Sequence, residues 1–306
     1  MPTPLVSIGI TIWNGELFIA ETLDSLLAQD YENIEIIILD NLSTDHTSSI
    51  CAEYARKDKR VRYLLDSERR NVIEGQKRVF GYARGEYFMI ACDDDLYAPT
   101  YISRLLTLMS SDPSIGLGYS SYDYISPDGT RVSANFRIEN LLTRHNSRRR
   151  NFMHYLLHRN PIPIVFGLIR ANVHADALPY YFRVDERRWD HDNLYMLRLL
   201  SLAKVDSTGE VLFFYRQRDR EQLYRDRGQL APSLSRWKDY TENLSHQVRL
   251  TAVVRKIINA APFSYLEKRF LWLYAIAILL LNFRRLTRRL IPLDFRGLRR
   301  APRRTT

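Results

Sequence analysis

The chain has 306 residues, of which 45% are hydrophobic and 12% aromatic, so it can bury one large core and general disorder is excluded. Nine of its 45 basic residues lie in residues 284–306, beside one acid, Asp294, which leaves 36 basic and 34 acidic residues before them. Most of the net charge of +10 therefore belongs to a basic tail that suits an anionic surface, and we expect no nucleic-acid partner.

The N-terminal residues and the two cysteines indicate the cellular compartment of the protein. Met1-Pro-Thr-Pro-Leu5 leads directly into an apolar strand, without the basic start, apolar middle and small-residue cleavage site of a secretory signal. Cys51 and Cys92 do not form a Cys-x-x-Cys pair, so we expect two reduced thiols. We expect a cytoplasmic protein, with a possible peripheral position on the inner face of the cell membrane.

The first elements alternate between strands and helices. Short apolar runs predict strands at residues 5–12, 34–39 and 61–65, and helical periodicity predicts helices over 18–27 and 47–55. This alternation is typical of an open parallel sheet, in which ligands bind beyond the carboxyl ends of the strands.

Polar or aromatic groups follow three of the strands. Trp13 follows the first and Asp40 ends the second, while a helix over 75–84 leads to a fourth strand at 86–92 that stops at Asp93-Asp94-Asp95. Because parallel strands end at one edge of the sheet, we expect these groups to converge there.

The pattern is weaker after residue 112. It predicts a strand at 116–125, a flexible loop over the polar segment 140–151 with its Arg148–Arg150 run, and an extended apolar segment at 160–169. A helix at 188–202 and a strand at 211–215 follow.

Residues 233–291 are helical by periodicity. Within them, 270–281 is a run of 12 apolar residues, short of the roughly 20 that a membrane-spanning helix needs. Trp272 and Tyr274 in this run, and the paired arginines after it, favour an interfacial helix. The alternative is a buried helix with a solvated tail.

Each polar strand end has two interpretations. Adjacent carboxylates such as Asp93–Asp95 suit a divalent cation that also binds substrate phosphates, and the alternative is a solvated acidic turn. Asp40 suits a base or ribose contact, or a turn cap. Trp13 suits base stacking, or ordinary edge packing.

The order of four segments along the chain resembles glycosyltransferase family 2, an inverting family of GT-A fold, over residues 5–110. The segments are Val6-Ser-Ile-Gly-Ile-Thr-Ile-Trp-Asn-Gly-Glu16, Glu35-Ile-Ile-Ile-Leu-Asp-Asn-Leu-Ser-Thr-Asp45, Arg84-Gly-Glu-Tyr-Phe88 and Asp93-Asp-Asp95. The resemblance implies an α/β Rossmann-like fold with an open, mostly parallel twisted sheet flanked by helices.

The expected organisation has two parts. Residues 1–230 form the GT-A domain, with a nucleotide-sugar half at 1–110 and an acceptor half at 111–230. Residues 231–306 form a helical region with the basic tail, for which we expect membrane association.

The resemblance also implies roles for single residues in the first half. The donor-binding residues are Thr11, Trp13, Asn14 and Glu16 in the first loop, Asp40 and Asn41 at the nucleobase, and Lys77 and Arg78 near the phosphates. Asp93, Asp94 and Asp95 cover the motif for Mn²⁺ or Mg²⁺, with Asp94 favoured as the first ligand. Cys92 occupies the family's first acidic position, which leaves open which two carboxylates face the cation.

Two segments of the second half are similar to the family. His191-Asp-Asn-Leu-Tyr-Met-Leu-Arg-Leu199 resembles a Glu-Asp-x-x-Leu-x-Leu-Arg-Leu helix start, with His191 in place of Glu. Asp192 is then the candidate base, with Asp190 as fallback and a helix N-cap as the alternative role. Tyr215-Arg-Gln-Arg218 resembles an Arg-x-His segment, and its Arg216 suits a diphosphate.

The implied reaction is an inverting sugar transfer from a nucleotide sugar, with UDP expected and GDP or dTDP not excluded. The expected acceptor is a glycan or lipid-linked glycan in cell-surface polysaccharide assembly, since a membrane-facing tail suits it. A sugar nucleotidyltransferase is disfavoured, because no Gly-rich loop followed by Arg and Lys lies near the first strand. The remaining alternative is an inactive nucleotide-binding or membrane-surface protein on the same fold.

Overall fold

The computed structural model describes residues 3–132, 147–158, 164–181, 191–217 and 236–290. Predictions that concern Asp190, Arg218 or the tail from residue 291 onward lie outside the described residues.

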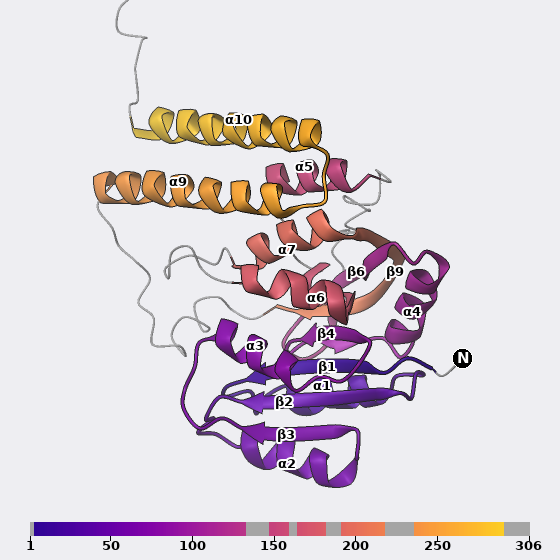
Figure 1. Cartoon of the computed structure of the whole chain (residues 1–306). Coiled ribbons are helices and arrows are strands. Elements are labelled where there is room, and N and C mark those ends of the chain that lie inside the picture. The colour runs from indigo at the N-terminus through magenta and orange to yellow at the C-terminus, as the bar shows by residue number, and fades with distance from the viewer. Residues whose placement is uncertain (1–2, 133–146, 159–163, 182–190, 218–235, 291–306) are drawn as a thin grey trace, which may run out of the picture.

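The first half alternates strands and helices, as expected. Its elements are β1 (Val6–Ile12), α1 (Ile19–Leu27), β2 (Ile34–Asp40), α2 (Thr47–Lys57), β3 (Val61–Leu65), α3 (Val72–Gly81) and β4 (Tyr87–Ala91). The strands pair in parallel in the order β3-β2-β1-β4 (Figure 1). α3 begins at Val72, three residues before the expected start, because the Asn71 side chain caps it by accepting from the Glu74 amide at 3.0 Å.

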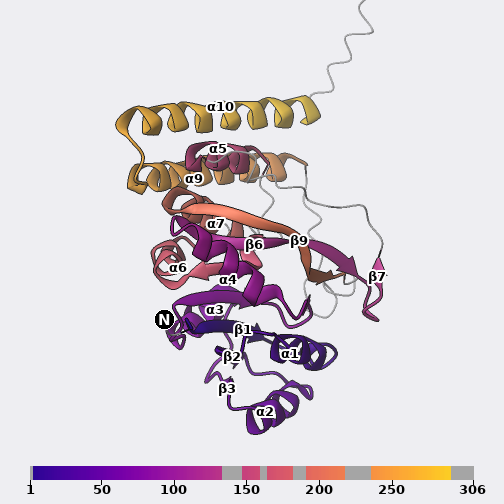
Figure 2. The ribbon, with the colours of Figure 1, turned by 90° about the vertical axis from the view of Figure 1, so that its right-hand side faces the viewer.

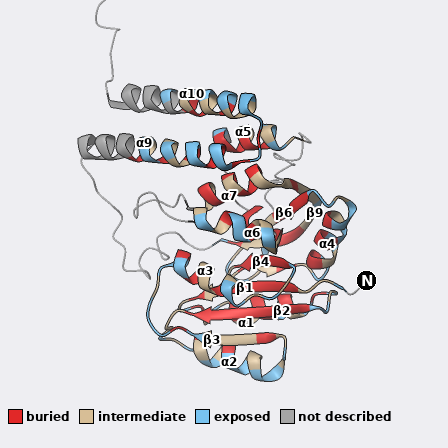
Figure 3. Ribbon diagram, viewed as in Figure 1, coloured by how far each residue is buried: buried red, intermediate tan, exposed pale blue. Residues whose placement is uncertain are grey.

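Burial on both faces explains why the sequence of β2 is almost wholly apolar before Asp40, with Glu35 as the exception. Ile36 and Ile38 pack into the core that contains α1, whereas Ile37 and Leu39 pack into the core beneath α3. Figure 3 shows β2 buried along its length. A strand covered by helices on both faces has no polar side, so its period-two pattern disappears.

The sheet continues through the second half of the chain. The elements are β5 (Leu96–Tyr97), α4 (Tyr101–Ser111), β6 (Ile115–Ile125), β7 (Arg131–Val132), α5 (Arg148–His158), η1 (Ile164–Phe166), β8 (Leu168–Arg170), α6 (Ala171–Ala177), η2 (Leu178–Tyr180), α7 (His191–Leu202) and β9 (Lys204–Arg216). The strand order continues β4-β8-β6-β9-β5, with β7 beside β6. β8 is antiparallel to both neighbours, and β6 and β9 are parallel.

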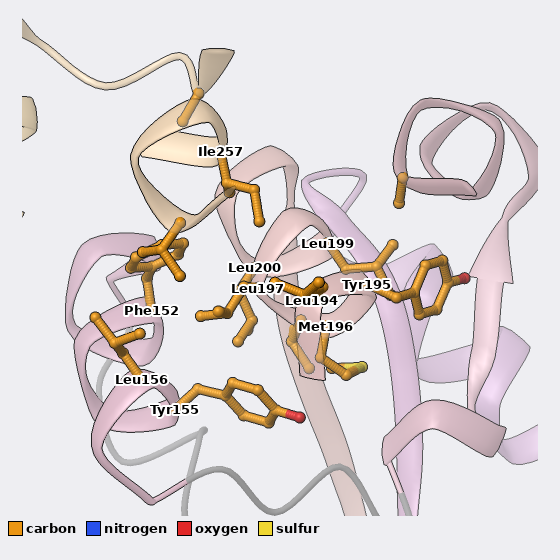
Figure 4. Close-up of a cluster of buried hydrophobic side chains, with 14 of the residues drawn as sticks. Phe152, Tyr155, Leu156, Leu194, Tyr195, Met196, Leu197, Leu199, Leu200 and Ile257 are labelled. Atoms are coloured by element: carbon orange, nitrogen blue, oxygen red, sulfur yellow. The ribbon is translucent and has the colours of Figure 1, made fainter. Parts of the chain in front are cut away.

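Three expectations for this half need correction. The predicted loop over 140–151 is wrong from Arg148, because Phe152, Tyr155 and Leu156 recur at helical spacing and bury one face of α5 (Figure 4). Residues 164–166 form a 3₁₀ turn rather than extended chain. The last strand begins at Lys204, before the predicted 211–215 segment, because it pairs along most of β6.

Two long helices end the described chain. α9 (Arg236–Ala260) and α10 (Tyr265–Leu290) are antiparallel, and with α5 they lie above α7, on the far side from β1–β3 (Figures 1 and 2). They share a core with α5 and α7, and Figure 4 labels residues of this core on α5 and α7 together with Ile257 of α9. Among the described helices, none is long and apolar enough to cross a membrane.

His174 gives the fold a predicted dependence on pH. It lies buried on α6 between Phe80 and Phe88, its Nδ1 is hydrogen-bonded to the Tyr195 hydroxyl, and burial lowers its pKa to about 3. His174 is therefore protonated below about pH 6.5 in the unfolded chain, but only below about pH 3 in the folded chain. This stabilisation is complete above pH 6.5 and decreases as the pH falls.

We expect His174 to account for a loss of about 2 kcal/mol of unfolding free energy between pH 7 and pH 5. Urea unfolding of the wild type and of His174→Gln across this range measures it. The variant removes the titrating group, so its unfolding free energy should change less with pH. Equal slopes for the two proteins would refute the assignment.

Candidate active site

The loops after β1 and β2 are bonded into one unit. Three consecutive amides of the first loop donate to side chains of the second: Asn14 to Ser43 Oγ at 3.0 Å, Gly15 to Thr47 Oγ1 at 2.8 Å and Glu16 to Asp45 Oδ2 at 3.2 Å. In return, Glu16 Oε2 accepts from the His46 amide at 2.8 Å. Asn14 has a φ of 52°, which asparagine tolerates better than most residues. The predicted residues Asn14 and Glu16 therefore fix the shape of this edge.

Asp40 is fully buried at the end of β2 and holds the loop that follows it. One carboxylate oxygen accepts from the Ser43 amide at 2.9 Å, and the other accepts from the Ser48 and Tyr63 hydroxyls, both at 2.7 Å. These hydrogen bonds are those expected if Asp40 caps the turn after β2, which is the alternative to a role in base or ribose binding. Asn41 lies beside it and exchanges two hydrogen bonds with the Arg70 backbone, at 2.6 and 2.8 Å. Contact with a nucleobase stays a prediction for both.

Trp13 lies half-buried at the carboxyl end of β1. The guanidinium carbon of Arg69 lies 3.7 Å from its ring centroid, a close cation–π contact. Within the described chain, Trp13 Nε1 is buried without a hydrogen-bond partner. Thr11, two residues earlier, accepts a 3.0 Å hydrogen bond from Gln76 on α3. A base that stacks on Trp13 must therefore use the other ring face or displace Arg69.

The two predicted phosphate-binding residues on α3 lie in different settings. Arg78 forms an ion pair with Asp66, which follows β3 and is almost completely buried. Burial would raise the pKa of Asp66, but hydrogen bonds from Arg78 and from the Ser67 amide hold it below its ordinary value. Lys77 is half-buried on the same helix. Of these two residues, Arg78 is therefore the one whose charge is already paired with a carboxylate of the protein.

The motif after β4 brings three potential metal-ligand side chains together. Cys92, Asp94 and Asp95 each offer one ligand atom, and these atoms lie within 4.8 Å of one another. The two carboxylates in that span fit one Mn²⁺ or Mg²⁺ ion, because these cations take oxygen ligands, and the sulfur lies beside them. Asp93 lies outside this group: a Cβ added to Gly15 would meet its Oδ2 at 2.6 Å, so its carboxylate lies against the β1–α1 loop.

Arg216, at the end of β9, holds the metal motif in place through hydrogen bonds to Asp94 and Asp95. Its guanidinium donates to the Asp94 carbonyl, the Pro127 carbonyl and the Glu21 carboxylate, each at 2.7 Å, and its amide donates to Asp95 Oδ1 at 2.9 Å. The side chain is fully buried. The arginine predicted to neutralise a diphosphate is therefore engaged in positioning two residues of the candidate metal-ligand group, and a direct phosphate contact stays a prediction.

Arg216→Met should weaken both the fold and the cation site. Removing the guanidinium leaves two carbonyl groups without their donor, so we expect unfolding to become easier by about 2 kcal/mol or more, and Mn²⁺ affinity to fall. Arg104→Met is the matched control, because the Arg104–Glu210 ion pair is solvent-exposed and should contribute little. Thermal unfolding and Mn²⁺ titration of both variants measure the difference. Similar behaviour of the two variants would contradict the positioning role.

Asp192, the candidate base, lies in the first turn of α7. The buried Tyr181 is hydrogen-bonded to it: burial raises the pKa of this tyrosine well above its ordinary range, and the charge and hydrogen bond of Asp192 raise it further. The charge of Cys92 in the metal motif also raises the Tyr181 pKa, so Tyr181 lies within electrostatic range of both groups. Tyr181 thus links the start of α7 to the metal motif, although the two are about a hundred residues apart in sequence.

Sequence reasoning missed four residues of this site: Glu21, Asp66, Arg69 and Tyr181. Asp66 had a detectable signal, because it follows a predicted strand as Asp40 does. The other three gave no local signal. Their roles depend on contacts with Arg216, Trp13 and Asp192, which are known only once the chain has folded.

The comparisons identify the family. The model described as Glycosyl transferase family 2 matches residues 7–173, more than half of the chain. Glycosyltransferase GlyG of Streptococcus pneumoniae serotype 4 is 31% identical over 126 residues, which cover 41% of this chain and 42% of GlyG. The match therefore spans less than half of that relative.

Solved structures support the fold. S. aureus TarS in complex with UDP-GlcNAc has a TM-score of 0.61 at 16% identity, over 86% of this chain and 69% of that chain. The Pyrobaculum calidifontis mannosyltransferase PcManGT in complex with GDP-Man and Mn²⁺ has a TM-score of 0.52 at 15% identity, over 90% and 74%. The family match and this architecture lead to one conclusion: the chain belongs to glycosyl transferase family 2 and has the GT-A fold.

Proposed function

We propose that the protein is a glycosyltransferase that inverts the anomeric configuration, uses a UDP-sugar with a divalent cation, and transfers the sugar to a glycan or lipid-linked acceptor in cell-surface polysaccharide assembly. The observation that carries the proposal is the convergence of three groups at one sheet edge. The metal-ligand group, the bonded β1 and β2 loops and the start of α7 meet there. TarS with UDP-GlcNAc and PcManGT with GDP-Man and Mn²⁺ supply precedents for donor and metal.

The proposed donor site lies between the two bonded loops and the metal motif. Trp13 offers a ring face to the base, and Asp40 and Asn41 hold the β2–α2 loop beside it. Asp94 and Asp95, with Cys92, would hold Mn²⁺ or Mg²⁺. The cation, when bound, offsets the charge that develops on the departing diphosphate. Because Arg78 forms an ion pair with Asp66, Lys77 is the basic side chain of α3 that we assign to a phosphate.

The proposed reaction is a single displacement. The acceptor hydroxyl loses its proton to the Asp192 carboxylate as its oxygen bonds to the anomeric carbon. The bond between that carbon and the diphosphate oxygen breaks on the opposite face, so the configuration inverts and the bonding electrons leave with the diphosphate. The hydrogen bond between Tyr181 and Asp192 orients the carboxylate. No covalent sugar–enzyme intermediate forms.

Slow hydrolysis of the donor tests this proposal without knowledge of the acceptor. The protein is incubated with Mn²⁺ and each of a set of α-linked UDP- and GDP-sugars, and proton NMR records the first anomer of the released sugar. Water that replaces the acceptor should give the β anomer first. An α anomer would contradict single displacement, and no release from any donor would favour the inactive-protein alternative.

A further inference from the structure

Helix α10 has two apolar faces, and the protein covers one of them. Leu271, Ala275 and Ile278 are buried and belong to the core shared with α5, α7 and α9. They recur at spacings of four and three residues, which places them on one side of the helix. This side accounts for the docking of α10 onto the domain, and it leaves the opposite side unused.

The opposite side of α10 carries large apolar residues in solvent. Leu266 is 76% exposed, Phe270 50%, Leu273 66% and Leu280 60%. Their spacings of four, three and seven residues place them in one row about half a turn away from the buried side. We call this row the α10 outer face. An unbroken row of this kind marks an interaction surface, whereas scattered single residues would need no explanation.

Arginines lie at the first end of the α10 outer face. The Arg149 guanidinium carbon lies 5.8 Å from the Phe270 ring centroid, and Arg148 and Arg150, on the same turn of α5, are exposed. Hydrogen bonds from Ser264 lower the pKa of Glu267 at the start of α10, and the charges of Arg149 and Arg148 lower it further. The Arg148–Arg150 run that the sequence placed in a loop therefore lies beside the start of this row.

Basic residues also follow the row at its other end. The sequence of the last turns of α10 contains Arg284, Arg285, Arg288 and Arg289. An apolar row with arginines before and after it is complementary to a bilayer surface, where acyl chains accept the apolar side chains and anionic headgroups attract the arginines.

We propose that the α10 outer face docks the protein in the plane of an anionic lipid surface. A second copy of the chain suits the face less well. Packed along the same row in either direction, two copies would bring their arginine groups together, and like charges repel. The proposal goes beyond the sugar transfer and does not depend on it, although a docked enzyme would meet a lipid-linked acceptor directly.

Vesicle co-sedimentation of the full chain tests the proposal. Binding is measured to vesicles of mixed phosphatidylglycerol and phosphatidylcholine, and to vesicles of phosphatidylcholine alone, at low and high salt. Leu273→Asp and the double variant Leu273→Asp with Leu280→Asp alter the outer face. Val248→Asp on α9 is the matched control, because Val248 is 55% exposed and lies outside the row. Circular dichroism confirms that each variant is folded.

We expect binding to the anionic vesicles, weakened by salt, and a loss of about tenfold or more in the double variant but not in Val248→Asp. Equal binding by the double variant, or no binding of the wild type, would overturn the proposal. So would a wild-type dimer in light scattering that the double variant abolishes, since a second copy would then cover the face. Nucleotide binding, measured alongside, reports separately on the proposed transfer function.

Discussion

Asp94→Ala is expected to lower metal-supported sugar transfer by about 100-fold or more. Asp94 supplies one of the three ligand atoms that lie within 4.8 Å of one another, and its backbone carbonyl is held by Arg216 at 2.7 Å. Without this carboxylate the cation loses a ligand, and the charge on the departing diphosphate is less well offset. The initial rate of nucleotide release, measured across a Mn²⁺ titration, gives both the loss of rate and the loss of apparent metal affinity.

Asp93→Ala is the most informative comparison for this variant. Its carboxylate is adjacent in sequence but lies against the β1–α1 loop, outside the ligand group. We therefore expect a smaller loss of rate and little change in the Mn²⁺ concentration required. If Asp93→Ala raised that concentration more than Asp94→Ala did, the assignment of the metal ligands would be wrong.

Asp192→Asn should lower kcat by about 100-fold to 10,000-fold while donor binding stays nearly unchanged. The substitution preserves the size of the side chain and its contact with Tyr181, but an amide cannot accept the acceptor proton at neutral pH. The loss should therefore appear in kcat and not in the donor KM. Single-turnover rates, together with calorimetric binding of the donor nucleotide, separate the two quantities.

Asp190→Asn decides between the two candidate bases. It changes the neighbouring carboxylate by the same chemistry, and Asp190 lies outside the described residues. A larger loss of kcat in Asp190→Asn than in Asp192→Asn would transfer the role to Asp190. Near-normal kcat in both variants would exclude either carboxylate as the base.

The alternation of strands and helices was predictable because it depends on local patterns. The apolar segment Ile34–Leu39 signals a strand covered on both faces, and Asp40 marks its end without any knowledge of the neighbours. Trp13 and Asp93–Asp95 were found at strand ends in the same way. The edge of a parallel sheet collects these groups whatever the details of packing, so the sequence located this edge as a candidate site.

The roles of single side chains were harder to predict, because they depend on distant contacts. Arg216 bonds to Asp94 and Asp95 from more than a hundred residues away, and the local sequence around it contains no sign of this. Asp40 shows the same limit: its position was predictable, but its three bonds to Ser43, Ser48 and Tyr63 were not. The start of α5, residues 148–151, was assigned to a loop because its arginine run is polar, and the apolar spacing of Phe152, Tyr155 and Leu156 begins only after it.

Calorimetric titration of the wild-type chain with UDP, GDP and dTDP, with and without Mn²⁺, tests the central claim most directly. The claim is that the metal-ligand group and the two bonded loops form a single donor site. It predicts that one nucleoside diphosphate, expected to be UDP, binds with Mn²⁺ and binds at least about tenfold more weakly without it. Binding of no nucleotide under either condition, or equal binding with and without Mn²⁺, would contradict it.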